Sequence, residues 1–314
     1  MSFTQDIKKE LTSLEIGRKC CQLAQITGFL RFAGSITLSS GKMGIKVSTD
    51  NPAVARLFVT LVKEYFGTKT SLQIEEGQML RKGHMYNLVI TPEMNAEAIL
   101  RETGAIGIKE GSNYLKDGIE AAIIKKRCCK KSALRGIFMA AGSVSDPTKA
   151  YHLEIPCASS LMANDVKKLI NSFGLKSKIV ERRSKFVVYI KDAEQISDFL
   201  SVLGASNQLF KFENIRIAKE MKNNANRISN CESANADKTV NAAQKIIQDI
   251  SFIEEKTGLD YLPEKLKDTA VLRRDNPELS LSELAQLFDP PLGKSGLNHR
   301  LNKISLIANE LRGV

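Results

Sequence analysis

The sequence lacks a hydrophobic run long enough to cross a membrane. No apolar stretch approaches the roughly 18 residues that a spanning helix needs, and the first residues are polar, with Ser2, Thr4 and Gln5. A secretory signal peptide needs a basic start and an apolar segment, so none is expected. With 43% hydrophobic and 26% charged residues, the composition is that of a globular protein. The 314 residues predict two or three domains in a cytoplasmic protein.

Cysteine motifs of the form CxxC are also missing. The six cysteines form two adjacent pairs, Cys20-Cys21 and Cys128-Cys129, together with Cys157 and Cys231. Neighbouring residues of a helix point in different directions, so each pair is expected to be a poor bidentate metal ligand. We therefore expect buried, reduced thiols, with no metal and no other cofactor.

What the chain does contain is a duplicated segment. The stretch CCQLAQITGFLRFAGSI, from Cys20 to Ile36, returns 108 residues later as CCKKSALRGIFMAAGSV, from Cys128 to Val144. Self-similarity at a fixed offset indicates two copies of one structural unit. Without any gap, the coinciding positions include Cys20/Cys128, Cys21/Cys129, Gly28/Gly136, Ala33/Ala141, Gly34/Gly142 and Ser35/Ser143.

The residues after each copy repeat one succession of patterns. Alternating apolar residues, such as Ile45 and Val47, predict strands, and apolar residues three or four apart predict helices. Gly67 and Gly174 follow predicted helices, as stop signals do. The predicted fold class is α+β, with two tandem αββαββα repeats, about 18–104 and 126–204, that pair as a pseudo-dimer within residues 1–210. A lead-in helix is expected at residues 5–16, and a loop from residue 105 onwards.

The repeated core resembles a known signature. Residues 26–34 and 134–142, ITGFLRFAG and LRGIFMAAG, are similar to the nine-residue motif of LAGLIDADG homing endonucleases. Gly28 and Gly136 lack a Cβ, so two helices can cross closely there. Gly34 and Gly142 stand where each helix must stop and turn into a strand. A glycine-containing core helix of no special family is the alternative, and the duplication argues against it.

The resemblance implies an acid directly before the last glycine of each motif, and the two acids would hold divalent metal over DNA. Those positions are Ala33 and Ala141, and the second position that is often acidic holds Arg31 and Met139. A methyl group cannot coordinate Mg²⁺, which needs oxygen ligands, and two-metal cleavage then has nothing to hold its ions. We predict that the chain is not an enzyme; an active homing endonuclease is the less favoured alternative.

Positive charge is concentrated in the first two thirds of the chain. Residues 1–210 carry 30 Lys and Arg against 20 Asp and Glu, which accounts for +10 of the net +11. Such an excess is typical of proteins that bind a polyanion. Phosphate contacts are predicted where basic residues gather, with solvated loops as the alternative: Lys125, Lys126 and Arg127, Arg81 and Lys82, and Arg182, Arg183 and Lys185.

Residues 211–238 depart from both repeats. They are rich in asparagine and poor in large apolar residues, so we predict a structured linker. The run from Asn226 to Asn235 is too particular for a flexible spacer, and its polar side chains would tie two domains together or contact phosphate, Arg227 included.

Residues 239–314 predict an all-α domain. Apolar stripes mark helices around Ile247 and Leu266, and the sequence Ser280-Leu281-Ser282-Glu283 has the form of a capping box that opens a short helix. A break at Pro290-Pro291 precedes a last helix that begins near Ser295. A short helix, a turn and a longer helix form a helix-turn-helix.

The polar face of this last helix is the predicted DNA-reading surface. Asn can pair with adenine, and Lys or Arg with guanine, in the major groove, mainly from the first half of a recognition helix. A three-helix bundle that binds protein is the alternative. The predicted DNA contacts are Ser295, Asn298, His299, Arg300, Asn302 and Lys303.

The whole chain resembles the WhiA family of regulators. The resemblance rests on the degenerate signature pair, the Asn226–Asn235 run and the segment from Lys294 to Leu301. It implies a nucleoid-associated DNA-binding protein linked to sporulation-associated transcription and to cell division. Double-stranded DNA is the implied partner, with another regulator or RNA polymerase as candidates, and no membrane or small-molecule substrate. An architectural nucleoid protein, which binds DNA without sequence preference, is the alternative.

Overall fold

A computed structural model of the chain describes residues 2–39, 41–76, 84–183 and 185–313. The described chain divides into two compact units, Met1–Glu220 and Met221–Val314. The first is mixed helix and sheet, and the second is built from helices alone in its described part. Among the described residues, no helix has the length and apolarity needed to cross a membrane.

The first repeat follows the predicted order of helix, hairpin, helix, hairpin, helix. Its four strands form an antiparallel sheet in the order β1-β2-β4-β3. Ile45 and Val47 of β2 face the core, as their alternation predicts. The elements are α2 (Lys19–Ala33), β1 (Gly34–Ser39), β2 (Lys42–Thr49), α3 (Pro52–Phe66), β3 (Ser71–Glu76), β4 (His84–Ile90), η1 (Pro92–Met94) and α4 (Ala96–Glu102).

The second repeat has the same topology, with the sheet order β7-β8-β10-β9. Neighbouring strands of this second sheet are antiparallel, as they are in the first sheet. The predicted fold class is therefore confirmed. The elements are α5 (Arg127–Ala141), β7 (Ser143–Val144), β8 (Leu153–Cys157), α6 (Ser160–Asn171), β9 (Lys178–Arg182), β10 (Lys185–Ile190) and α7 (Ala193–Leu203).

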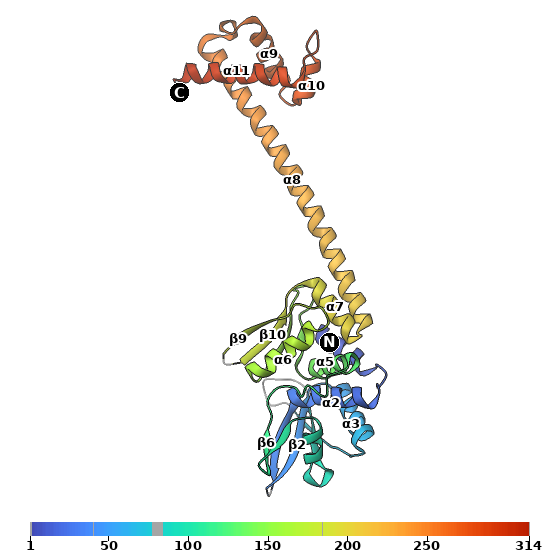
Figure 1. The fold of residues 1–314 in the computed structure, drawn as a ribbon. Helices are drawn as coiled ribbons and strands as arrows, with labels where there is room; N and C mark the ends of the chain where they lie inside the picture. The colour runs from blue at the N-terminus through green and yellow to red at the C-terminus, as the bar shows by residue number, and fades with distance from the viewer. Residues whose placement is uncertain (1, 40, 77–83, 184, 314) are drawn as a thin grey trace. The chain divides into compact units, whose positions relative to one another are not determined.

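The two signature helices, α2 and α5, cross in the centre of the first unit (Figure 1). A Cβ on Gly28 would lie 2.3 Å from the backbone oxygen of Ala133, and a Cβ on Gly136 would lie 2.2 Å from the backbone oxygen of Gln25. Real Cβ atoms do not approach backbone so closely, so glycine is required at both positions. The predicted close helix crossing is confirmed.

Gly34 and Gly142 end their helices, but for a different reason from the expected one. Their backbones are extended, with φ of −89° and −70°, and not left-handed. A Cβ would instead lie 2.4 Å from the Leu30 oxygen at Gly34, and 2.3 Å from the Phe138 ring at Gly142. Glycine is required at both positions because a Cβ would clash with the last helical turn, and not because the backbone adopts a conformation that only glycine tolerates.

The loop expected between the repeats contains a hairpin, β5 (Ile106–Lys109) and β6 (Ser112–Leu115). Its turn is Glu110-Gly111, both at positive φ, as two-residue hairpin turns require. Ile106 is buried, which fixes the register against Leu115. The prediction of a plain loop was wrong, because a hairpin with only short strands and a Glu-Gly turn gives a weak sequence signal.

The predicted lead-in helix begins and ends earlier than expected, as α1 (Phe3–Thr12). The hydroxyl oxygen of Ser2 accepts a hydrogen bond from the Gln5 amide and caps it. Phe3, Ile7 and Leu11 are buried, which confirms its packing on the first unit.

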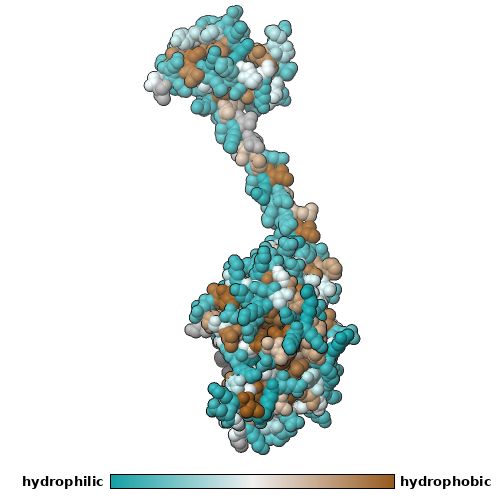
Figure 2. Space-filling model, in the orientation of Figure 1, coloured by the Kyte–Doolittle hydropathy of each residue, from teal (hydrophilic) through white to brown (hydrophobic). Residues whose placement is uncertain are grey.

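The asparagine-rich segment is helical. Helix α8 (Ser206–Thr257) runs through all of residues 211–238, so a linker of irregular structure is not formed. Asparagine is a weak helix former, but this stretch contains no glycine or proline to end the helix, and Ala, Lys and Glu support it. Figure 2 shows mostly hydrophilic residues along the middle of α8.

The second unit comprises the last part of α8, η2 (Leu259–Tyr261), α9 (Glu264–Asp275), α10 (Leu281–Gln286) and α11 (Lys294–Arg312). The capping box of Ser280 and Glu283 is present, as predicted. Arg312 of α11 donates to the buried Asp249 of α8 at 2.6 Å. The hydrophobic core of the second unit contains Ile250, Ile253, Leu266, Ala270, Leu284, Leu297, Leu301, Ile304 and Ala308.

The helix crossing predicts a large stability difference between two glycine substitutions. Gly136→Ala should lower the free energy of unfolding by about 1–3 kcal/mol or more, because its methyl group forces the helix backbones apart. Gly296→Ala, in α11 with no atom near the new Cβ, should raise it by roughly 0.5–1 kcal/mol. Urea denaturation followed by circular dichroism measures both, and equal effects would contradict the packing argument.

Candidate nucleic-acid interface

The helix-turn-helix is formed by α10, the turn after it, and α11. Leu284 and Ala285 of α10 and Leu297 and Leu301 of α11 are buried in one core. Arg273 of α9, only 2% exposed, donates through Nη1 to the Leu279 carbonyl at 2.5 Å, which fixes the segment before α10. Burial lowers the pKa of Arg273. Buried contacts thus hold α11 on one side only.

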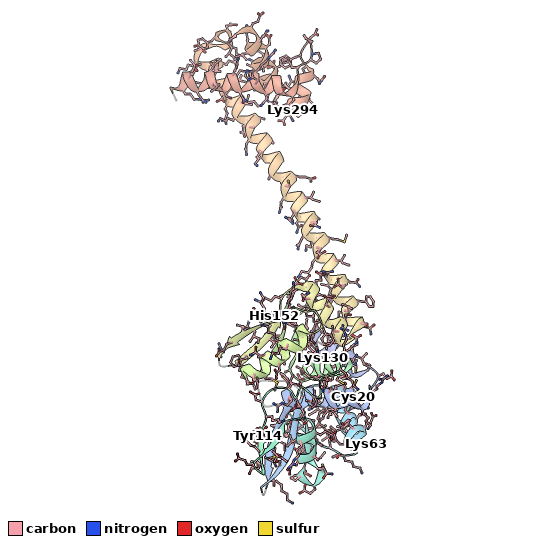
Figure 3. The ribbon with its side chains drawn as sticks, viewed as in Figure 1. Cys20, Lys63, Tyr114, Lys130, His152 and Lys294 are labelled. Atoms are coloured by element: carbon pink, nitrogen blue, oxygen red, sulfur yellow. The ribbon has the colours of Figure 1, made fainter. Side chains whose placement is uncertain are left out.

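The opposite side of α11 is polar and exposed. Ser295, Asn298 and Asn302 lie within one arc, because residues three and seven apart share a helix face. Ser295 and Asn298 line one shallow depression together with Leu281 and Lys294 (Lys294 is labelled in Figure 3). This arrangement presents two amide groups beside a cation.

His299 and Lys303 lie on the adjoining side of α11. Both are exposed and line a depression with Pro263 and Lys265 of the neighbouring segment around α9. His299 and Lys303 therefore lie beside the polar arc of Ser295, Asn298 and Asn302 and not within it.

Arg300 differs from the other predicted DNA contacts. It is half-buried, and its guanidinium lies 5.5 Å from the centre of the Phe288 ring. Phe288 belongs to the segment between α10 and α11, so Arg300 joins the two parts of the motif. Its contact with DNA remains a prediction.

Two lysines near this surface were missed by the prediction. Lys294 is exposed in the first turn of α11, and Lys238 of α8 lines a groove that also contains Asn298. The signal for Lys294 was its place between Gly293 and Ser295 at a helix start. Lys238 follows the asparagine-rich run, but its place beside Asn298 had no local signal, because α8 approaches α11 only in the folded unit.

The ends of α2 and α5 carry no ligand for a metal ion. Ala33 and Ala141 are half-buried and lead directly into β1 and β7. Within the described residues, the only group of three or more His, Cys, Asp or Glu side chains with metal-binding spacing is a set of four cysteines. It lies at the other ends of both helices, near the first residues Lys19 and Arg127.

The expectation that the cysteines are buried was wrong for Cys128 and Cys231, which are exposed. Cys20, Cys21, Cys128 and Cys129 place their sulfur atoms within 4.8 Å of one another, and Cys128 is exposed. The two adjacent pairs, one at the start of each crossing helix, therefore meet at one place. Cys157 is buried as expected, and Cys231 is exposed.

The predicted phosphate contacts of the first unit that the structure describes lie at the β9–β10 turn and at the start of α5. Arg182 and Lys185 face each other across β9 and β10 and are exposed, and Arg183 occupies the turn between them at φ 47°. Arg182 Nη1 lies 3.7 Å from Glu154 Oε2, which offsets part of its charge. Arg81 and Lys82, the expected counterparts, lie outside the described residues.

Lys125, Lys126 and Arg127 are exposed at the start of α5, at the end of that helix away from β7. The Arg127 guanidinium lies 5.4 Å from the centre of the Phe173 ring. Arg227 is exposed on α8. Each of these phosphate contacts remains a prediction.

Comparison with known proteins agrees with the domain order seen in the structure. Three family models match: the WhiA N-terminal LAGLIDADG-like domain at residues 19–106, the WhiA LAGLIDADG-like domain at 130–222, and the WhiA C-terminal HTH domain at 225–308. The "Probable cell division protein WhiA" of Clostridium beijerinckii is 43% identical over 312 residues, which is 99% of each chain. The chain belongs to the WhiA family.

Other WhiA proteins are similar over the same length. The protein of that name from Thermoanaerobacter pseudethanolicus is 43% identical and covers 99% of this chain and 98% of its own. The crystal structure of full-length DUF199/WhiA from Thermatoga maritima matches with a TM-score of 0.60 at 26% identity, over 99% of both chains. A crystal structure of an N-terminal LAGLIDADG domain of DUF199/WhiA, at 22% identity and TM-score 0.51, shares the fold over 65% of this chain and 90% of that one.

The contact between Arg300 and Phe288 predicts that two neighbouring substitutions on α11 act differently on stability. Arg300→Ala should lower the free energy of unfolding by about 0.5–2 kcal/mol, because it removes a cation–π contact. Asn298→Ala should change it by less than about 0.5 kcal/mol, since the side chain is exposed. Thermal unfolding followed by circular dichroism tests this, and an unchanged Arg300→Ala variant would contradict it.

Proposed function

We propose that this WhiA-family chain is a sequence-specific DNA-binding transcription regulator linked to sporulation and cell division. Its proposed place is the cytoplasm, on the nucleoid, with double-stranded DNA as partner. The observation that carries the proposal is the exposed arc of Ser295, Asn298 and Asn302 on a helix whose opposite side is locked in a core. Amide side chains on a rigid recognition helix can pair with adenine edges in the major groove.

The first unit supplies charge rather than base recognition in this proposal. Its excess of Lys and Arg attracts the DNA backbone, and phosphate contacts position a protein without reading sequence. The proposed contacts are Arg182 and Lys185 at the β9–β10 turn, and Lys125 to Arg127 at the start of α5. RNA polymerase or a second regulator is the proposed protein partner of the same complex.

The duplicated unit is proposed to have no nuclease activity, because Ala33 and Ala141 offer no oxygen ligand for a divalent ion. The names of the relatives, which call them probable cell division proteins, are consistent with a regulatory role.

The test of sequence recognition begins by selecting bound duplexes from a random pool, since the operator has to be found. A variant with both Asn298→Ala and Asn302→Ala should bind the selected duplex at least about tenfold more weakly, because a good bidentate base contact contributes roughly 1–3 kcal/mol. Fluorescence anisotropy at one fixed salt concentration measures the affinity.

Leu306→Ala is the matched control, since Leu306 is exposed in the second half of the same helix and carries no charge. The control should bind like the wild type. If the double variant bound the selected duplex with the affinity of the wild type, the proposal would be contradicted. Equal wild-type affinity for selected and random duplexes, with a steep salt dependence, would favour an architectural DNA-binding protein instead.

Incubation with plasmid DNA tests the loss of cleavage. With Mg²⁺ or Mn²⁺ and a molar excess of the protein, supercoiled plasmid should remain uncut, because metal-assisted hydrolysis needs ligands that hold the ions. Any discrete linear product that disappears on adding EDTA would show an active nuclease and contradict this part of the proposal.

A further inference from the structure

Four cysteine sulfurs meet where the two repeats come together. Cys20 and Cys21 lie in the first turn of α2, and Cys128 and Cys129 lie in the first turn of α5 (Cys20 is labelled in Figure 3). All four sulfur atoms lie within 4.8 Å of one another, and those of Cys128 and Cys129 are 3.9 Å apart. The two pairs also face each other across the helices, Cys21 beside Cys128 and Cys20 beside Cys129.

The fold creates this cluster through the pseudo-symmetry of the two repeats. The cysteine pairs occupy equivalent positions, two turns before Gly28 and Gly136, where the helix backbones touch. Because the crossing holds α2 and α5 at closest approach, the beginnings of both helices stay near each other. The duplicated sequence thus brings two ligands from each repeat to one point.

We propose that Cys20, Cys21, Cys128 and Cys129 form a tetrathiolate site for a single Zn²⁺ ion that links the two repeats. A tetrahedron with Zn–S bonds of about 2.3 Å places its sulfurs about 3.8 Å apart. The observed separations need only small side-chain adjustments to reach that value. A cluster of two or four irons fits less well, because its thiolates bind different iron atoms and stand farther apart.

The surroundings suit four thiolates. Zn²⁺ displaces the four thiol protons, and the resulting complex carries net negative charge. Both helices start here without a capping side chain, so the positive ends of both helix dipoles lie near the four cysteines. The buried Ser132 and the half-buried Arg135, both on α5, also lie close to Cys21.

The four cysteines differ in their exposure to solvent. Cys21 and Cys129 are buried and Cys20 is half-buried, which protects the bonds from water. Cys128 is exposed and gives the ion a path from solvent. With all four positions taken by protein, the ion has no open position for substrate, so its role is to stabilise the helix pair. This site goes beyond the proposed DNA-binding function and does not depend on it.

The test measures metal on the full chain, purified under reducing conditions without a histidine tag. After incubation with Zn²⁺ and gel filtration, elemental analysis should find one zinc ion per chain. Co²⁺ in its place should give the visible and near-ultraviolet absorption of a tetrahedral tetrathiolate complex. Cys128→Ser should weaken Zn²⁺ affinity at least about tenfold, measured by competition with a chromophoric chelator.

Cys231→Ser, at an exposed cysteine of α8, is the control and should keep the full stoichiometry and affinity. Cys128 is exposed, so its serine variant should keep the circular dichroism of the wild type; if it does not fold, the Co²⁺ spectrum of the wild type decides. Absence of stoichiometric zinc from the wild type, unchanged affinity of Cys128→Ser, or the spectrum of a multi-iron cluster would each overturn the proposal.

Discussion

The contact between the α2 and α5 backbones at Gly28 and Gly136 is the constraint on which the first unit depends. Each glycine leaves no room for even a methyl group against the facing helix. Two arginines then join this pair to its surroundings: Arg31 Nη2 donates to the Lys116 carbonyl at 2.6 Å, and Arg135 Nε donates to the Leu203 carbonyl at 2.7 Å. Burial lowers the pKa of both guanidinium groups. The crossing therefore positions both sheets and the segments that follow them.

Such a scaffold can lose its catalytic groups without losing its fold. The helix crossing depends on glycine at positions 28 and 136, whereas the residues at the helix ends, Ala33 and Ala141, are half-buried and contribute little to it. Acids there would serve chemistry and not packing. The residues that hold the fold together are thus not the residues at which a homing endonuclease would bind metal, so the fold can persist whether or not the chain cleaves DNA.

Much of the architecture could be predicted, because it rests on local patterns. The repeat revealed the order of elements, the glycines predicted the helix crossing, and the capping box at Ser280 predicted where α10 begins. The helix over residues 211–238 was not predicted, because the prediction gave more weight to the high asparagine content than to the absence of glycine and proline. The meeting of Cys20 with Cys129, and of Arg300 with Phe288, could not be predicted, because both follow from how separate helices pack.

The division of work between the two units is the central claim: α11 recognises bases, and the first unit adds phosphate contacts. Methylation interference on a selected duplex, with the full chain and with residues 221–314 alone, tests it most directly. The account predicts that methyl groups in the major groove block both proteins at the same bases, with weaker overall binding by the shorter one. Interference confined to the full chain, or none in the major groove, would contradict it.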